Sequence, residues 1–155
     1  MIVLFSVLGT ALGGALGALS RWKLDLAVKT RWIEKRALAG KPLRPYVGIV
    51  VINTVGCFLL GFLTGILPLL AVLVAGASKV DYPGITGTVR FVLSTGFLGG
   101  FTTFSTAVLD AWTEVWAHRV RAGMSLIVVG WVSGLVAYLL GLGLTPLVSY
   151  LLGIG

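Results

Sequence analysis

Charged and uncharged residues form long separate blocks along this chain. The charged side chains number 17, and all of them fall within residues 21 to 44, 79 to 90 and 110 to 121. The uncharged stretches are residues 1 to 20, 45 to 78, 91 to 109 and 122 to 155. Each is long enough to cross a hydrocarbon core of about 30 Å, which takes about 20 helical residues. The pattern therefore predicts an all-α membrane protein with four transmembrane helices.

The four helices are expected to form a single membrane domain. They are predicted at about residues 2 to 19, 47 to 70, 89 to 116 and 126 to 148 of a domain that covers residues 1 to 155. Pro68 is expected to kink or end the second helix. The loop that follows it contains Asp81, Pro83, Gly84 and Gly87. Residues 21 to 44 are predicted to form a solvated basic loop, in part an interfacial helix.

Composition and charge narrow the possible functions. A hydrophobic content of 57% and a mean hydropathy of +1.04 rule out a water-soluble domain. The net charge of +7 could suggest a nucleic-acid partner, but topology explains it, so none is expected. Ten basic residues fall on the side of windows 21 to 44 and 110 to 121, against Lys79 and Arg90 on the other. This imbalance places the two basic windows in the cytoplasm and both termini outside.

Glycines recur every four residues in several of the predicted helices. The small-residue stripes are Gly9, Gly13 and Gly17 in the first helix, Cys57, Gly61 and Gly65 in the second, and Gly130 and Gly134 in the last. Small residues at this spacing let helix backbones approach closely in lipid, where packing drives association. For the first and last helices, close packing is the expected role.

The helix predicted at residues 89 to 116 has a different kind of centre. It reads Gly96-Phe-Leu-Gly-Gly-Phe-Thr-Thr-Phe-Ser-Thr106, in which adjacent Gly99 and Gly100 precede four hydroxyl residues within five positions. A glycine costs about 1 kcal/mol relative to alanine in a helix, so we expect a break at the Gly99 and Gly100 pair. Backbone groups that a break frees inside a bilayer must be buried in protein or line a cavity. This segment is therefore predicted to be a functional element.

Asn53 is the only carboxamide in the chain and lies within a predicted span. A buried amide is costly unless it is paired, so Asn53 either holds helices together or faces a polar path. Asp, Glu, Lys, Arg and His are absent from the central part of every span. A proton-coupled carrier normally has a titratable carboxylate there. The amide, hydroxyl and phenyl groups that remain suit a passive pore for a small anion or a neutral solute.

These residues together resemble the Fluc (CrcB) family of fluoride channels. The resemblance covers all four helices in order and is carried by residues 96 to 106, by Gly13, Gly17 and Arg21, and by Asn53-Thr-x-Gly56. It implies a passive channel, not an enzyme, that exports fluoride across a bacterial or archaeal plasma membrane. It further implies an antiparallel dual-topology dimer with two pores and one structural sodium ion at the dimer centre.

The resemblance also implies roles for individual residues. Backbone carbonyls of Gly99 and Thr102 would hold the sodium ion. Arg21 and Asp110 match a vestibule arginine and an acidic residue after the break. The residues assigned to the fluoride pore are Asn53, with its amide facing the ion, Phe104, Thr103, Ser105, Thr106, and on the last helix Ser133 and Tyr138, which match only loosely.

Two features depart from the family pattern. The family usually reads Thr-Phe-Ser-Thr-Phe, but the fifth position here is Ala107, so a second pore phenylalanine is missing. Homodimeric members also tend to have balanced loop charges, whereas this chain has the ten-to-two bias described above. Both departures favour a heterodimer with an oppositely oriented relative. A homodimer remains the alternative.

Three alternative functions remain. A non-conducting helper subunit is consistent with Ala107. A small multidrug-type exporter has the same size and helix number but needs a membrane carboxylate. An intramembrane hydrolase could use Ser105 as its nucleophile, but His118, the only histidine, lies 13 residues further along the chain.

Overall fold

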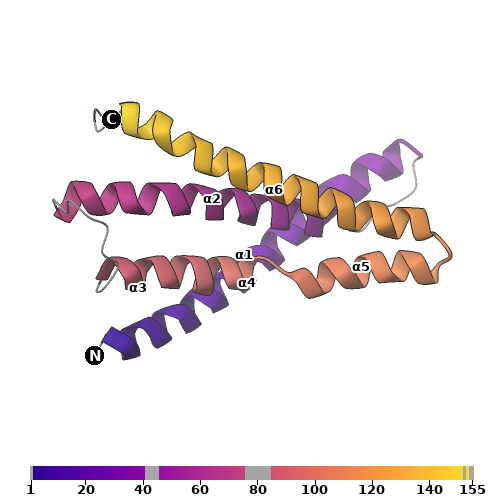
Figure 1. Ribbon diagram of the computed structural model, residues 1–155. Coiled ribbons are helices and arrows are strands. Elements are labelled where there is room, and N and C mark those ends of the chain that lie inside the picture. The colour runs from indigo at the N-terminus through magenta and orange to yellow at the C-terminus, as the bar shows by residue number, and fades with distance from the viewer. Residues whose placement is uncertain (1, 41–45, 76–84, 152, 154–155) are drawn as a thin grey trace.

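The computed structural model describes residues 2–40, 46–75, 85–151 and 153, whose regular structure is entirely helical (Figure 1). In chain order, the elements are α1 (Ile2–Leu38), α2 (Val47–Ala75), α3 (Ile85–Phe91), the π-helix η1 (Val92–Leu98), α4 (Gly99–Phe101), α5 (Phe104–Trp116) and α6 (Val120–Leu151). Within these residues, four helical stretches are long and apolar enough to cross a membrane: Val3–Leu38, Val47–Ala71, Gly87–Trp116 and Val120–Leu151. The prediction of an all-α protein with four spans is confirmed.

Three of the four spans run side by side, and the first crosses them obliquely. Figure 1 shows α2, α6 and the interrupted series from α3 to α5 extending in a similar direction, with α1 on a diagonal. The main packing partners are α2 with α6, α1 with η1 and α4, and α5 with α6. Ile49, Ile52 and Phe101 form a small buried core, against which Leu24, Phe97 and Ala107 pack. This core lies directly beside the interruption of the third span.

The first helix is about twice as long as predicted, with 37 residues. It continues through most of the expected basic loop, because residues 18 to 39 contain no glycine or proline and their Lys, Arg, Leu and Ala residues favour helix. Gly40 ends it with a φ of 61°, while its N–H donates to the carbonyl of Ala37 at 3.1 Å. Left-handed geometry of this kind commonly terminates helices at glycine.

Smaller differences concern other helix ends. The second helix passes through Pro68 and reaches Ala75, and the last begins at Val120 rather than near residue 126. Lys79, Asp81, Pro83 and Gly84 lie outside the described residues, as do Lys41 and Arg44.

The third span is broken, but not at the predicted position. Gly99 and Gly100 are helical, and the interruption falls at Thr102 and Thr103. Gly100 is needed inside the helix because an added Cβ would collide with the carbonyl oxygen of Gly14 on α1. Threonine is β-branched, and such residues favour extended backbone over a helix interior. The prediction of a break is therefore confirmed, and its placement at the glycine pair is wrong.

Glycines make most of the close helix contacts. A Cβ on Gly17 would collide with the Phe97 carbonyl oxygen, and one on Gly61 with the Tyr138 carbonyl oxygen. Gly141 would likewise meet the backbone of Phe58 and, at 2.8 Å, the Phe62 nitrogen. The predicted packing role is thus confirmed for Gly17. It is wrong for Gly130, where an added Cβ would meet no atom within 4 Å.

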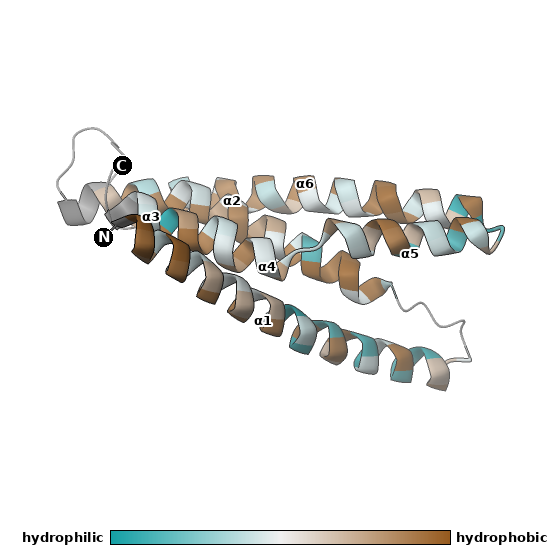
Figure 2. Ribbon diagram, turned by 90° about the horizontal axis from the view of Figure 1, so that it is seen from below, coloured by the Kyte–Doolittle hydropathy of each residue, from teal (hydrophilic) through white to brown (hydrophobic). Residues whose placement is uncertain are grey.

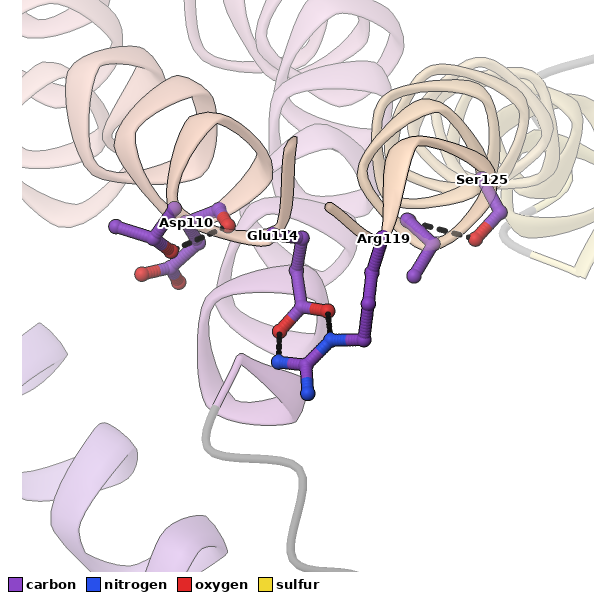
Figure 3. A network of polar contacts seen from close by, with 6 residues as sticks. Asp110, Glu114, Arg119 and Ser125 are labelled. Carbon is purple, nitrogen blue, oxygen red and sulfur yellow. Dashed lines mark hydrogen bonds and ion pairs between the residues drawn. The ribbon is translucent and has the colours of Figure 1, made fainter. Parts of the chain in front are cut away.

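A tight turn joins α5 to α6 (Figure 3). Glu114 receives two hydrogen bonds from the Arg119 guanidinium, from Nε at 2.7 Å and Nη2 at 2.8 Å. The contact raises the pKa of Arg119 and so favours its charged form. His118, between them, has a φ of 58°, which is unusual for a residue other than glycine. Asp110 lies on α5, one helical turn before Glu114.

We expect Gly17→Ala to destabilise the protein by about 1 to 3 kcal/mol, because the added methyl group must push α1 away from the backbone of η1 and α4. The matched control is Gly143→Ala on α6, where the new methyl group meets no atom within 4 Å. Thermal unfolding of the purified protein in detergent measures the difference. Equal melting temperatures for the two variants would contradict the packing role of Gly17.

Candidate ion pathway at the helix break

The backbone between α4 and α5 is extended for two residues. Thr102 has φ and ψ of −84° and 159°, and Thr103 has −150° and 120°. The Thr102 N–H and its hydroxyl both donate to the Leu98 carbonyl at 2.9 Å, which completes the last turn of the preceding helix. The N–H and carbonyl of Thr103 therefore need hydrogen-bond partners outside the helix.

Asn53 on α2 supplies both partners. Its Nδ2 donates to the Thr103 carbonyl at 3.0 Å, and its Oδ1 accepts from the Thr103 N–H at 3.0 Å. The single carboxamide of the chain therefore closes a two-bond ring with the backbone of Thr103. One amide hydrogen of Asn53 is not used in this ring.

This pairing also changes the environment of Gly99. In a continuous helix, the Thr103 N–H would donate to the Gly99 carbonyl four residues earlier. Here that N–H donates to Asn53, so the Gly99 carbonyl loses its helical donor. A carbonyl oxygen released in this way is a hard ligand of the type that alkali and alkaline-earth cations prefer. Gly99 and Thr102, the predicted sodium ligands, both line the cavity described next.

A cavity of about 770 Å³ lies beside the break, between α2, the third span and α6. Its polar lining residues are Tyr46, Asn53, Cys57, Ser94, Thr102, Thr103 and Asp110. Phe104 also lines it and is 72% exposed. Ala107 lines the same wall and packs on the buried core. The cavity is therefore mostly apolar, with its polar groups concentrated at the break.

Hydroxyl groups gather at the start of α5. Thr103 Oγ1 accepts a long hydrogen bond from the Thr106 N–H at 3.5 Å and thereby caps the helix. The same oxygen lies 3.3 Å from Ser105 Oγ and 3.2 Å from Thr106 Oγ1. The predicted hydroxyl residues are thus brought together, but of these three only Thr103 is part of the cavity lining.

The two candidates on the last helix lie elsewhere. Ser133 Oγ receives a hydrogen bond from Thr54 Oγ1 at 2.9 Å and donates to the Gly130 carbonyl at 3.2 Å, within the contact between α2 and α6. Tyr138 lies in the same contact, with its carbonyl against Gly61. Gly130, Trp131 and Gly134 form the cavity wall in their place. The assignment of Ser133 and Tyr138 to the pore remains a prediction that the cavity lining does not support.

Only one of the two predicted vestibule residues lines the cavity. Asp110 lines the cavity, whereas Arg21 on α1 does not. The neighbouring acidic residue on α1, Asp25, is paired with Lys29 at 2.7 Å.

Tyr46, Cys57 and Ser94 line the cavity although none was singled out as a pore residue. Ser94, Leu98 and Thr102 follow one another at intervals of four residues along the interrupted span, and this spacing could have identified Ser94. Tyr46 precedes α2 and gave no such signal.

Comparison with known proteins places these features in a family. The model of the family described as "CrcB-like protein, Camphor Resistance (CrcB)" matches residues 8–142. A fluoride-specific ion channel FluC of Erythrobacter litoralis is 32% identical over 144 residues, which is 93% of this chain and 94% of that protein. The FluC of Salinibacter ruber is 36% identical over 140 residues, covering 90% of this chain and 89% of its own length. The break, its asparagine and four spans therefore occur in a chain that belongs to the CrcB-like family.

Proposed function

We propose that this chain is a subunit of a passive channel that conducts fluoride out of the cytoplasm, and that it has no enzymatic role. The observation that carries this proposal is the ring between Asn53 and Thr103, which holds an open backbone beside a cavity within the membrane span. Relatives named fluoride-specific ion channels, which match about nine tenths of this chain, support it.

The groups at the break fit a small, strongly hydrated anion. Such an ion must exchange its water for a succession of moderate donors, because one very strong site would hold it too tightly to conduct. Asn53 has a second amide hydrogen, and the Thr103 hydroxyl lies next to it along the cavity. The Phe104 ring adds a weakly positive edge. Together these groups offer partial positive charge without a fixed cation.

We further propose a structural sodium ion bound by the carbonyls of Gly99 and Thr102. The released Gly99 carbonyl supports this, since an oxygen without its helical donor inside the membrane needs another partner. When bound, the ion would supply positive charge that stabilises the open backbone. A single chain offers only these two carbonyls, so a second subunit would complete the site.

An incomplete pathway favours a dimer. Phe104 is 72% exposed in the single chain, and Ala107 has no ring to offer the pathway. We propose an antiparallel assembly in which a second subunit covers this side of the cavity and contributes the missing phenylalanine. The ten-to-two distribution of basic residues gives this chain one orientation, with both termini outside, so the partner is an oppositely oriented relative rather than a second copy.

A helper subunit is the second candidate. Ala107, and the glycine wall at Gly130 and Gly134, leave this chain with few pore groups beyond the break. In that case the chain would complete the pore of its partner without conducting through a pore of its own. The hydrolase alternative gains no support, because Ser105 lies outside the cavity lining and His118 lies in the turn between α5 and α6.

The choice of partner can be tested by reconstitution. We expect liposomes containing this chain alone to release fluoride at the rate of protein-free liposomes, because every molecule has the same orientation bias and lacks the second ring. Coreconstitution with a family member from the same genome that has the opposite charge bias should produce rapid release, recorded with a fluoride electrode. Rapid release from the chain alone would contradict the heterodimer.

The role of Asn53 can be tested by a single change. In the preparation that conducts, Asn53→Asp should lower fluoride flux on the order of tenfold or more, because a carboxylate repels the anion and cannot donate to the Thr103 carbonyl. The matched control is Thr54→Val on the same helix, whose hydroxyl bonds Ser133 away from the cavity.

The size-exclusion profile and the fluoride-to-chloride flux ratio are measured for both variants, to separate misfolding from loss of conduction. If Asn53→Asp elutes normally and conducts as well as Thr54→Val, then Asn53 has no part in the pathway.

A further inference from the structure

The C-terminal half of α1 is the largest feature that the proposed pore does not use. With 37 residues, α1 is about 55 Å long, whereas the hydrocarbon core of a bilayer is about 30 Å thick. The uncharged part before Arg21 is already long enough to cross that core. The remaining half, from Arg21 to Leu38, therefore extends past it. Figure 2 shows this half diverging from the other helices.

Apolar side chains on this half point away from the protein. Trp22, Leu26 and Ile33 lie within about 40° of one another around the helix, and they are 61%, 54% and 36% exposed. Leu24 lies on the opposite side and packs on the buried core, and Asp25, about 80° from the stripe, lies against Gly48 of α2. The exposed stripe is thus unpartnered in the single chain, and at this distance along α1 it lies at or beyond the edge of the hydrocarbon core.

Basic residues surround the same stretch. Residues 21 to 38 contain six basic and two acidic side chains, a net charge of +4. Lys29 is paired with Asp25, and the Arg36 guanidinium lies 5.6 Å from the centre of the Trp32 ring. Lys23, Arg31 and Lys35 form no ion pair with any described residue. On the helical wheel these three lie within about 120° of one another, but the six basic residues together spread over about 240°, so the charge is not confined to one face.

This combination fits the headgroup layer of a membrane. Indole rings are favoured at that depth, and long basic side chains can keep their apolar stems near the acyl chains while their charges reach phosphate groups. A helix that lay flat on a membrane would need all its charges on one face. A helix that crosses the layer obliquely has headgroups on several sides, which matches the spread of the six basic residues around this half of α1.

We propose that the half of α1 from Arg21 to Leu38 binds anionic phospholipid headgroups, with Trp22, Leu26 and Ile33 at the boundary of the acyl chains. The positive charge and the continuity with a membrane span select an anionic lipid surface as the occupant. The binding holds the extension within the headgroup layer and fixes the tilt of α1. It does not depend on fluoride conduction, so failure of the proposed channel function would leave it standing.

The proposal predicts an excess of anionic lipid next to Ile33. A fluorophore is attached to Ile33→Cys in a Cys57→Ser background, and the full chain is reconstituted in mixed phosphatidylcholine and phosphatidylglycerol vesicles. Phosphatidylglycerol with brominated acyl chains should quench the fluorophore at least about twofold more than the same fraction of brominated phosphatidylcholine. The control is Leu4→Cys, at the other end of α1 and 62% exposed, which should show no preference.

Two further measurements identify the cause of the preference. Each basic residue near a membrane surface strengthens its attraction to anionic lipid by about fivefold. Replacing Lys23, Arg31 and Lys35 with glutamine should therefore bring the quenching ratio close to that of the control. High salt should lower the quenching ratio in the chain that keeps all three basic residues, a test that does not depend on the folding of the charge variant.

Equal quenching by both lipids would overturn the proposal. So would the absence of quenching by either lipid, which would place the segment in water or under a second subunit.

Discussion

The pairing of Asn53 with the backbone of Thr103 is the constraint on which the rest of the structure depends. Two extended residues in the middle of a membrane span leave an N–H and a carbonyl without water to satisfy them, at a cost of several kcal/mol. A carboxamide is the one neutral side chain that offers a donor and an acceptor side by side, and the chain has a single one. Its two bonds of 3.0 Å fix α2 against the break. They also release the Gly99 carbonyl and place one spare amide hydrogen along the cavity.

Packing of α1 reinforces this constraint from the other side of the third span. Gly14 and Gly100 bring two backbones together, and Gly17 does the same with Phe97 and Phe101. The glycines that at first suggest a point of weakness therefore serve a close contact, and the break falls just beyond it. Phe101 is buried between this contact and the core residues Ile49 and Ile52. The last helical residue before the break is thus held by packing, while the second residue of the break, Thr103, is held by hydrogen bonds.

The sequence predicts those features that depend on local composition. The four spans follow from the three windows of charged residues. Each window is too costly to bury in lipid, and each uncharged stretch is long enough to cross the hydrocarbon core. The length of α1 was underestimated because hydropathy measures where lipid ends, whereas propensity and the position of Gly40 decide where the helix ends. The break was misplaced because its partner, Asn53, is 50 residues away in the chain. Ser133 and Tyr138 were assigned to the pore without knowledge of which face of α6 packs on α2.

The same physical features that complete the break favour the proposed second subunit. Ala107 is part of the wall and of the core contact, so Phe104 lines the cavity without a phenylalanine at position 107. The wall of α6 is built from Gly130, Trp131 and Gly134, which adds no hydroxyl group. Meanwhile, the excess of basic residues on one side favours one orientation, and the proposed attraction of the α1 extension to anionic headgroups would act in the same direction. A chain held so firmly in one orientation cannot readily supply its own inverted partner. The proposed heterodimer therefore follows from membrane electrostatics as much as from the missing phenylalanine.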